Sequence, residues 1–145
     1  MLIIGAYIEE VVMPITSEVL REGRVVLFTY PKAFTMAEVN AIYEGFEREI
    51  LAKATRKVHT IADLSAVTEI PPNVLSLSVG MTKKSHPGIG TIFIVTPQRF
   101  INSLAGLLTK LVPNQKVLIR ESVEEALKEA DRLIASEVSE NRKQA

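Results

Sequence analysis

The chain has 145 residues, of which 47% are hydrophobic, and 17 basic residues balance 17 acidic ones, so its formal net charge is zero. This length is typical of one domain, and the neutral balance argues against a general nucleic-acid binder, which would carry a basic excess. The lack of cysteine excludes disulfides and zinc–cysteine sites and fits a reducing compartment. We expect one cytoplasmic domain over residues 1–138 and a polar C-terminal tail over residues 139–145.

Two apolar stretches bear on membrane insertion or export. Residues 1–4 have no basic region before them and are soon followed by Glu9 and Glu10, so they do not match a signal peptide. The most apolar later stretch, residues 89–112, contains Arg99 and Lys110, whereas a membrane span needs about 20 mainly apolar residues with few or no charges. We therefore expect no transmembrane segment.

Short runs rich in β-branched and aromatic residues predict strands. The first covers residues 7–13, and the second is the nearly continuous apolar run of residues 25–30. Only about ten residues separate these two runs, which suits an antiparallel hairpin or edge pairing better than a parallel crossover. Further strands are predicted at residues 58–62, 91–95 and 117–119.

Helix signatures alternate with these strands. Thr35 and Ser122 each stand three residues before a glutamate, which is a capping box, and Thr96 followed by Pro97 marks another helix start. Apolar residues then recur at helical spacing. They are Val39, Ile42, Tyr43, Phe46 and Ile50 in the first helix; Phe100, Ile101, Leu104, Leu107, Leu108 and Leu111 in the second; and Ala126, Leu127, Ala130, Leu133 and Ile134 in the last.

The alternation of strands and helices predicts an α/β fold, because it implies right-handed crossovers and a largely parallel sheet. With an antiparallel first pair, the expected structure is a single-domain mixed, mostly parallel sheet of about five strands. Residues 73–84 are ambiguous from their local pattern. Leu75, Leu77, Val79 and Met81 alternate as in a strand, whereas Val74, Leu75 and Ser78 would suit a helix.

Residues 61–70, with the sequence IADLSAVTEI, resemble the signature of the STAS family, the sulfate-transporter and anti-sigma-factor-antagonist domains. In that signature a strand ends in Asp/Asn-Leu, followed by Ser-x-Val-x-x-Ile/Met and then by Asp-Ser-Ser-Gly-Leu at a helix start. The matching positions are Asp63, Leu64, Ser65, Val67, Ile70 and Leu75. The order of elements also agrees over most of the chain. The resemblance implies that residues 73–84 are helical, so that about four helices pack on the sheet.

The chain departs from the family where Asp-Ser-Ser-Gly is expected, because it has Pro71, Pro72, Asn73 and Val74 there. In antagonist-type members a partner kinase phosphorylates a serine at this helix start, which switches binding off. Asn73 aligns with that serine and has no hydroxyl to phosphorylate, although its side chain can still cap a helix. The chain is therefore similar to a divergent STAS domain that lacks the usual serine phosphoswitch.

Asp63 is the first candidate for chemistry, because open α/β sheets place their sites at the carboxyl ends of strands. Response-regulator receivers also use an aspartate after a third strand, but the acidic pair and the lysine that they need are not at their expected places. We favour a role in which Asp63 caps the turn into Leu64 and Ser65. Ser65 and Thr68 could be modified or bind an anion, but such hydroxyls more often make local backbone hydrogen bonds.

The two histidines, His59 and His86, do not form a recognisable site. The acid nearest to His59 in sequence, Asp63, lies four residues on along the same strand, about 13 Å away, which is too far for a hydrogen bond. We therefore expect a structural His59. Two histidines without a carboxylate cluster make a poor metal site, and residues 88–90 precede a strand, unlike a phosphate-binding loop. We expect no catalytic set, no metal and no cofactor.

The resemblance, together with this lack of a catalytic set, predicts a non-enzymatic protein-interaction or regulatory module. Its expected partner-binding residues are Asp63, Leu64, Ser65, Pro72, Asn73 and Leu75. The adjacent prolines would stiffen the loop, and a rigid loop binds at a lower ordering cost. A small-molecule or lipid-binding carrier or sensor domain is the alternative, because STAS-like scaffolds are related in shape to lipid carriers and apolar helices could line a pocket. An enzymatic function ranks third. A homodimer is expected only because homodimers are common among proteins.

Overall fold

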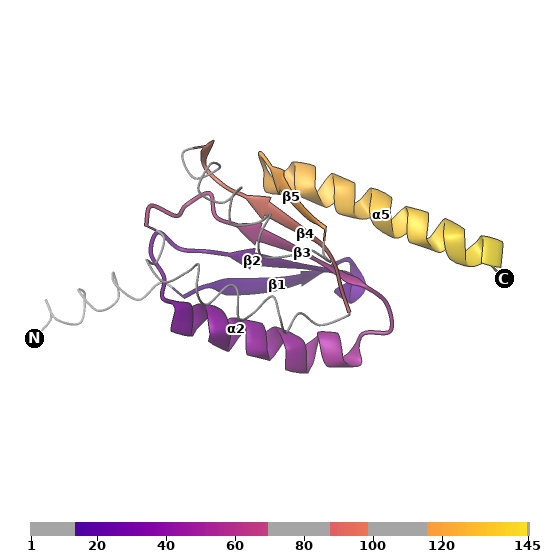
Figure 1. Cartoon of the computed structure of the whole chain (residues 1–145), viewed down its shortest axis with the longest axis horizontal. Coiled ribbons are helices and arrows are strands. Elements are labelled where there is room, and N and C mark those ends of the chain that lie inside the picture. The colour runs from indigo at the N-terminus through magenta and orange to yellow at the C-terminus, as the bar shows by residue number, and fades with distance from the viewer. Residues whose placement is uncertain (1–13, 70–87, 99–115, 145) are drawn as a thin grey trace, which may run out of the picture.

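A mixed sheet forms the centre of the protein (Figure 1). The computed structural model describes residues 14–69, 88–98 and 116–144, and its five strands lie in the order β1-β2-β3-β4-β5. Strand β1 (Thr16–Leu20) pairs antiparallel with β2 (Val25–Thr29). The other pairs are parallel and join β2, β3 (Val58–Asp63), β4 (Ile89–Val95) and β5 (Val117–Arg120). The mixed, mostly parallel sheet predicted from the sequence is therefore confirmed.

Strand β1 does not occupy the predicted position. The strand predicted at residues 7–13 lies outside the described residues, and the antiparallel partner of β2 is a segment for which no strand was predicted. A short 3₁₀ turn, η1 (Arg21–Gly23), joins β1 to β2, and its residues have φ angles of 53°, 57° and 89°. The first two are not glycine, and each such left-handed residue costs about 1–2 kcal/mol. The hairpin therefore contains a strained turn.

Helix α2 (Met36–Glu49) follows β2 and begins where the capping pattern predicts. Thr35 Oγ1 accepts the backbone N–H of Glu38 at 3.2 Å, and its hydroxyl donates to the Glu38 carboxylate at 3.1 Å. Phe46, which belongs to the predicted apolar stripe, is 4% exposed and meets the ring of Phe28 edge to face at 5.3 Å. The cap and the apolar face therefore dock this helix on the sheet.

Helix α5 (Val123–Gln144) follows β5, and Ser122 Oγ accepts an N–H from its first turn at 3.1 Å. Ala126 and Ala130 are fully buried, and their small side chains let the helix approach the sheet closely. The strand residues buried with them are Val25, Ile61, Phe93 and Val95. The helix includes residues 139–144, which the sequence analysis assigned to a polar tail.

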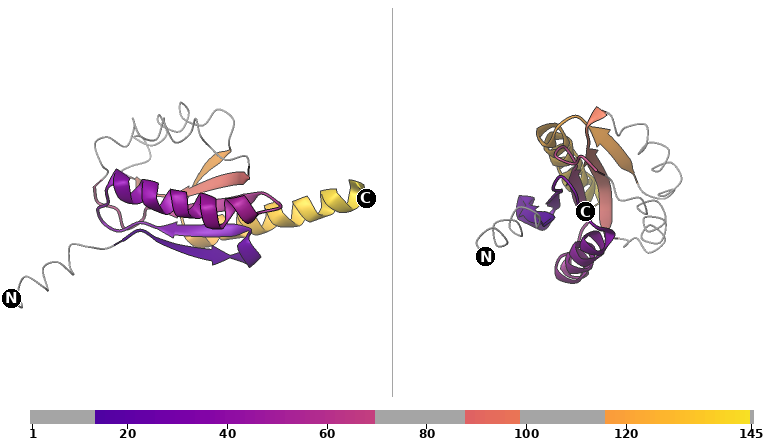
Figure 2. Two further views of the ribbon diagram at one scale, coloured as in Figure 1. Left: turned by 90° about the horizontal axis from the view of Figure 1, so that it is seen from below. Right: turned by 90° about the vertical axis from the view of Figure 1, so that its left-hand side faces the viewer.

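The two helices cover opposite faces of the sheet (Figure 2). Two α-helices are thus described where about four were predicted. Residues 73–84 lie outside the described residues, and only Gln98 of the helix predicted after Thr96 and Pro97 is described as helical. Among the described helices, none combines the length and the apolar character that crossing a membrane requires.

Candidate functional site

The loop that follows β3 is organised around Asp63. The Asp63 carboxylate oxygen Oδ1 accepts the backbone N–H of Ser65 at 3.0 Å and the Ser65 hydroxyl at 2.6 Å. The N–H of Val67 donates to the carbonyl of Leu64 at 3.1 Å, which closes a turn with Ser65 and Ala66 at its exposed tip. This geometry agrees with the capping role expected of Asp63, and Val67, only 1% exposed, anchors the far side of the turn.

Backbone hydrogen bonds fasten this loop to both of its neighbours. The Leu64 N–H donates to the carbonyl of Val95, at the end of β4, at 2.6 Å. On the other side the carbonyl of Lys32 accepts the N–H groups of Thr68 and Glu69, at 2.8 and 3.3 Å, and the Thr68 hydroxyl at 3.3 Å. The Thr68 hydroxyl therefore bonds a backbone carbonyl distant in sequence rather than a local one.

An aromatic pair supports the same end of the sheet. The N–H of Tyr30 donates to the carbonyl of Asp63 at 3.0 Å, and the Tyr30 ring meets the Phe34 ring edge to face at 5.0 Å. Burial raises the pKa of Tyr30 to about 12, so its hydroxyl stays protonated near neutral pH. Tyr30 can therefore pack or hydrogen-bond there, but it does not supply a base.

The predicted partner-binding residues fall into two groups. Asp63, Leu64 and Ser65 meet in the described loop at the carboxyl end of β3, whereas Pro72, Asn73 and Leu75 lie outside the described residues. Open α/β sheets form their ligand crevice where the strand order reverses. In the described sheet the strand order follows the chain order without a reversal, so the loop lies at the carboxyl end of the central strand and not in such a crevice.

A second polar cluster lies near the amino ends of β2 and β3 and surrounds His59. This histidine is 3% exposed, and its Nδ1 accepts the backbone N–H of Thr91 at 3.0 Å. Its Nε2 lies 3.1 Å from Oε1 of Glu137 in α5. Because Nδ1 accepts a hydrogen bond, the ring proton must sit on Nε2, which donates to the carboxylate. Both ring nitrogens are therefore engaged.

A β-bulge in β4 makes room for the His59 ring. The residues paired on either side of it are Val58 with Ile89 and Thr60 with Ile92, so β4 carries one residue more than β3 between these pairs. A bulge disrupts the ladder locally, and here the N–H of Thr91 points to the imidazole. At Gly90 a Cβ would lie 2.5 and 2.6 Å from Nδ1 and Cε1 of His59. The ring therefore occupies the space that a side chain at Gly90 would need.

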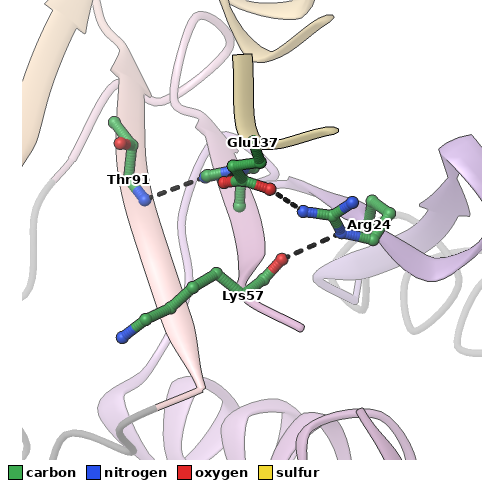
Figure 3. Close-up of polar contacts among 5 residues, drawn as sticks. Arg24, Lys57, Thr91 and Glu137 are labelled. Carbon is green, nitrogen blue, oxygen red and sulfur yellow. Dashed lines mark hydrogen bonds and ion pairs between the residues drawn. The ribbon is translucent and has the colours of Figure 1, made fainter. Parts of the chain in front are cut away.

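Glu137 joins α5 both to β3 and to the turn that precedes β2. Its other carboxylate oxygen forms an ion pair with Arg24, whose guanidinium also donates from Nε to the Lys57 carbonyl at 3.1 Å (Figure 3). The side chains of Arg24 and Glu137 are 16% and 30% exposed. In the described part of the chain, no buried side-chain nitrogen or oxygen lacks a hydrogen-bond partner. The cluster is thus a satisfied network.

His59 is held in its neutral form. Burial lowers the pKa of His59 from the ordinary value of 6.5; Glu137 acts to raise this pKa, and the charge of Arg24 lowers it further. A neutral ring with both nitrogens bonded would have to break a hydrogen bond before it could accept a proton or bind a metal. This agrees with the structural role expected of His59.

Sequence reasoning missed Glu137 as the partner of His59, because 78 residues separate the two. One signal was available: Glu137 continues the apolar stripe of α5, three residues after Ile134 and seven after Ala130. A carboxylate on the face that a helix turns to a sheet needs a buried partner, and the histidine in β3 is one.

A surface hollow of about 370 Å³ lies beside β1 and the segment that follows α2. Val19, Ile50 and Val58 contribute apolar surface, and charged side chains such as Lys53 and Arg56 also line it. The hollow is open to solvent and flanked by these charged side chains, so it does not form the enclosed apolar pocket that a lipid would need. Among the described residues, no group of three or more His, Asp or Glu side chains could hold a metal ion.

Comparisons with known proteins return no match, whether to a protein-family model, to a curated protein or to a solved structure.

Proposed function

We propose that this chain is a non-enzymatic STAS-like module that binds another protein through the loop at the carboxyl end of β3. The observation that carries this proposal is the turn capped by Asp63, which exposes Ser65 and Ala66 while its backbone is held from both sides. The resemblance at residues 61–70 supports the proposal, because the residues that carry it include this turn. The mixed sheet is in keeping with the element order on which that resemblance also rests.

The hydrogen bonds of the loop favour binding because they reduce the conformational entropy that the loop would lose on association. Association must order the flexible groups of an interface, at about 0.5–1.5 kcal/mol for each side chain that is immobilised. The carbonyl of Lys32 and the carboxylate of Asp63 already hold the loop backbone in place before a partner arrives. In this proposal Asp63 shapes the loop, and Leu64 and Ser65 contact the partner, together with Pro72, Asn73 and Leu75 from the segment that follows.

Binding in this proposal is not switched by phosphorylation at the family's usual position. Asn73 stands there and has no hydroxyl. We place the module in the cytoplasm, because a chain without cysteine fits a reducing compartment. A carrier for a small molecule or lipid remains the rival function, although the described hollow is open to solvent and partly lined by charged side chains, which does not favour an apolar ligand.

Two alanine-to-arginine variants test the binding role. Ala66 lies at the exposed tip of the turn, and Ala52 is exposed in the short helix η2 (Leu51–Lys53) that follows α2. Tagged wild type, Ala66→Arg and Ala52→Arg are used to capture proteins from lysate of the source cells, with quantitative mass spectrometry. We expect a partner captured equally by wild type and Ala52→Arg and lost with Ala66→Arg. Titration calorimetry with the purified partner then measures the loss of affinity.

The proposal fails if every captured protein binds Ala66→Arg as well as it binds Ala52→Arg. Native mass spectrometry of the same purified samples addresses the carrier hypothesis. A reproducible co-purifying small molecule would favour a carrier, whereas a mass equal to that of the bare chain would argue against one.

A further inference from the structure

We propose that His59, Glu137 and Arg24 form a pH-sensitive latch, which holds the C-terminal part of α5 on the sheet and releases it when His59 takes up a second proton. The latch is independent of the proposed binding role. It lies near the amino ends of β2 and β3, whereas the partner-binding loop follows the carboxyl end of β3.

In the closed latch, a second N–H on the His59 ring would find no hydrogen-bond acceptor. Nδ1 of His59 faces the N–H of Thr91 at 3.0 Å, so a proton on Nδ1 would set two donors against each other. The ring already fills the space beside the Gly90 backbone that a side chain there would need, so it has little room to shift toward β4. A charged imidazolium therefore fits only after the ring and its neighbours have moved and water has entered.

The C-terminal part of α5 is the neighbour that can move. The first half of the helix is fixed by the fully buried Ala126 and Ala130 and by Glu129, which pairs with Arg120 of β5 at 2.6 Å. Beyond them along α5, Glu137 makes polar contacts to His59 of β3 and to Arg24, which precedes β2. Its two oxygens are shared between His59 and Arg24, and these two polar contacts add to the packing of Leu133 and Ile134 against the core.

The charges around the ring determine the direction of the pH response. Glu137 in α5 and Arg24 in the turn before β2 act on the ring directly. Other charged residues on the same segments include Lys57, which precedes β3, and the exposed pair of Arg21 and Asp131. The facing part of β4, Gly90 and Thr91, has no titratable group. Arg21 is paired with Asp131 at 2.7 Å and Arg24 with Glu137, so the carboxylate nearest to the ring is already partly neutralised.

Proton uptake therefore favours the open state. Burial, the largest influence, lowers the pKa of His59 in the closed state, and a hydrated ring in the open state would take up a proton near pH 6.5. By linkage, each pH unit below about 6.5 shifts the equilibrium toward release by up to tenfold, until the closed state is protonated as well.

Single cysteines can report this release, because the natural chain has no cysteine. Ile134→Cys places a thiol at a half-buried position on the sheet-facing stripe, close to Glu137. Ala135→Cys places a thiol at the next, exposed position of the same helix. The rate of reaction with 4,4′-dithiodipyridine is measured from pH 7.5 to pH 5. The ratio of the two rates largely cancels the pH dependence of the thiol.

We expect the rate ratio of Ile134→Cys to Ala135→Cys to rise at least about threefold between pH 7 and pH 5. In a His59→Gln background, where the side chain can donate to Glu137 but cannot titrate, the ratio should stay constant. A constant ratio with His59 present would overturn the proposal. Met36→Cys, buried on the opposite face at 5% exposure, reports global unfolding. A parallel rise at that site would also overturn the latch.

Discussion

Replacing Gly90 by alanine would put a methyl group into the space of the His59 ring. The new Cβ would lie 2.5 and 2.6 Å from ring atoms and 3.3 Å from Cβ of Lys57. If the ring retreats, a buried donor at Thr91 loses its acceptor, at about 1–3 kcal/mol, and the bond to the Glu137 carboxylate is lost, at about 1.5–3 kcal/mol. Alanine offsets about 0.4–1 kcal/mol of this loss, because it lowers the conformational entropy of the unfolded chain. Allowing for partial relaxation, we expect Gly90→Ala to lower the free energy of unfolding by about 2–4 kcal/mol.

The same substitution at Gly45 provides a matched control with the opposite sign. Gly45 lies within α2, and a Cβ there would meet nothing within 4 Å. Gly45→Ala should therefore raise the free energy of unfolding by about 0.8–1 kcal/mol, since alanine is the better helix former. Urea unfolding at pH 7.5 is followed by far-ultraviolet circular dichroism, because the chain has no tryptophan to report by fluorescence.

Two results would refute this reasoning. One is a Gly90→Ala protein that unfolds at the same urea concentration as the wild type, or at a higher one as Gly45→Ala should. The other comes from a double-mutant cycle with His59→Ala. Once the ring is gone, only the effect of alanine on the unfolded chain should remain, so Gly90→Ala should stabilise by about 0.4–1 kcal/mol. An undiminished cost would show that the clash does not involve His59.

Three further predictions concern stability. The pKa of His59 is lower in the folded chain, so the unfolded chain binds the proton at a higher pH. The free energy of unfolding is therefore unaffected above about pH 6.5. Below that pH it falls by up to about 1.4 kcal/mol per pH unit, until the folded chain also binds the proton. Urea titrations at pH 7 and pH 5 should show a smaller difference for His59→Gln. Glu22→Gly should raise the melting temperature by about 2–4 °C, because glycine adopts the φ of 57° at this position without the backbone strain of about 1 kcal/mol that glutamate has there. Ser122→Ala removes the N-cap of α5 and should cost about 1 kcal/mol in urea unfolding, whereas an unchanged midpoint would exclude a stabilising cap.

Much of the fold was predictable because its determinants are local. The strand at Val25–Thr29 is an apolar run, and the strand at Val58–Asp63 is rich in β-branched residues and largely buried. Both described helices begin at capping residues that act within a single turn. The turn at Asp63 was predictable for the same reason, since its carboxylate bonds a residue two positions away. Strand β1 was missed because its residues are almost all exposed. It is a strand through its hydrogen bonds to β2 rather than through a pattern of its own.

The sequence alone thus determined the fold class, most strand positions, the caps of both described helices and the turn that forms the proposed binding loop. Only the tertiary structure decided the environment of His59. Its partners come from β4, 32 positions along the chain, and from α5, 78 positions along it, and the space for its ring depends on a bulge in a neighbouring strand. Hydrogen bonds and ion pairs act over a few ångströms in space, so contacts between residues so far apart in the chain exist only once the sheet and the helix have packed.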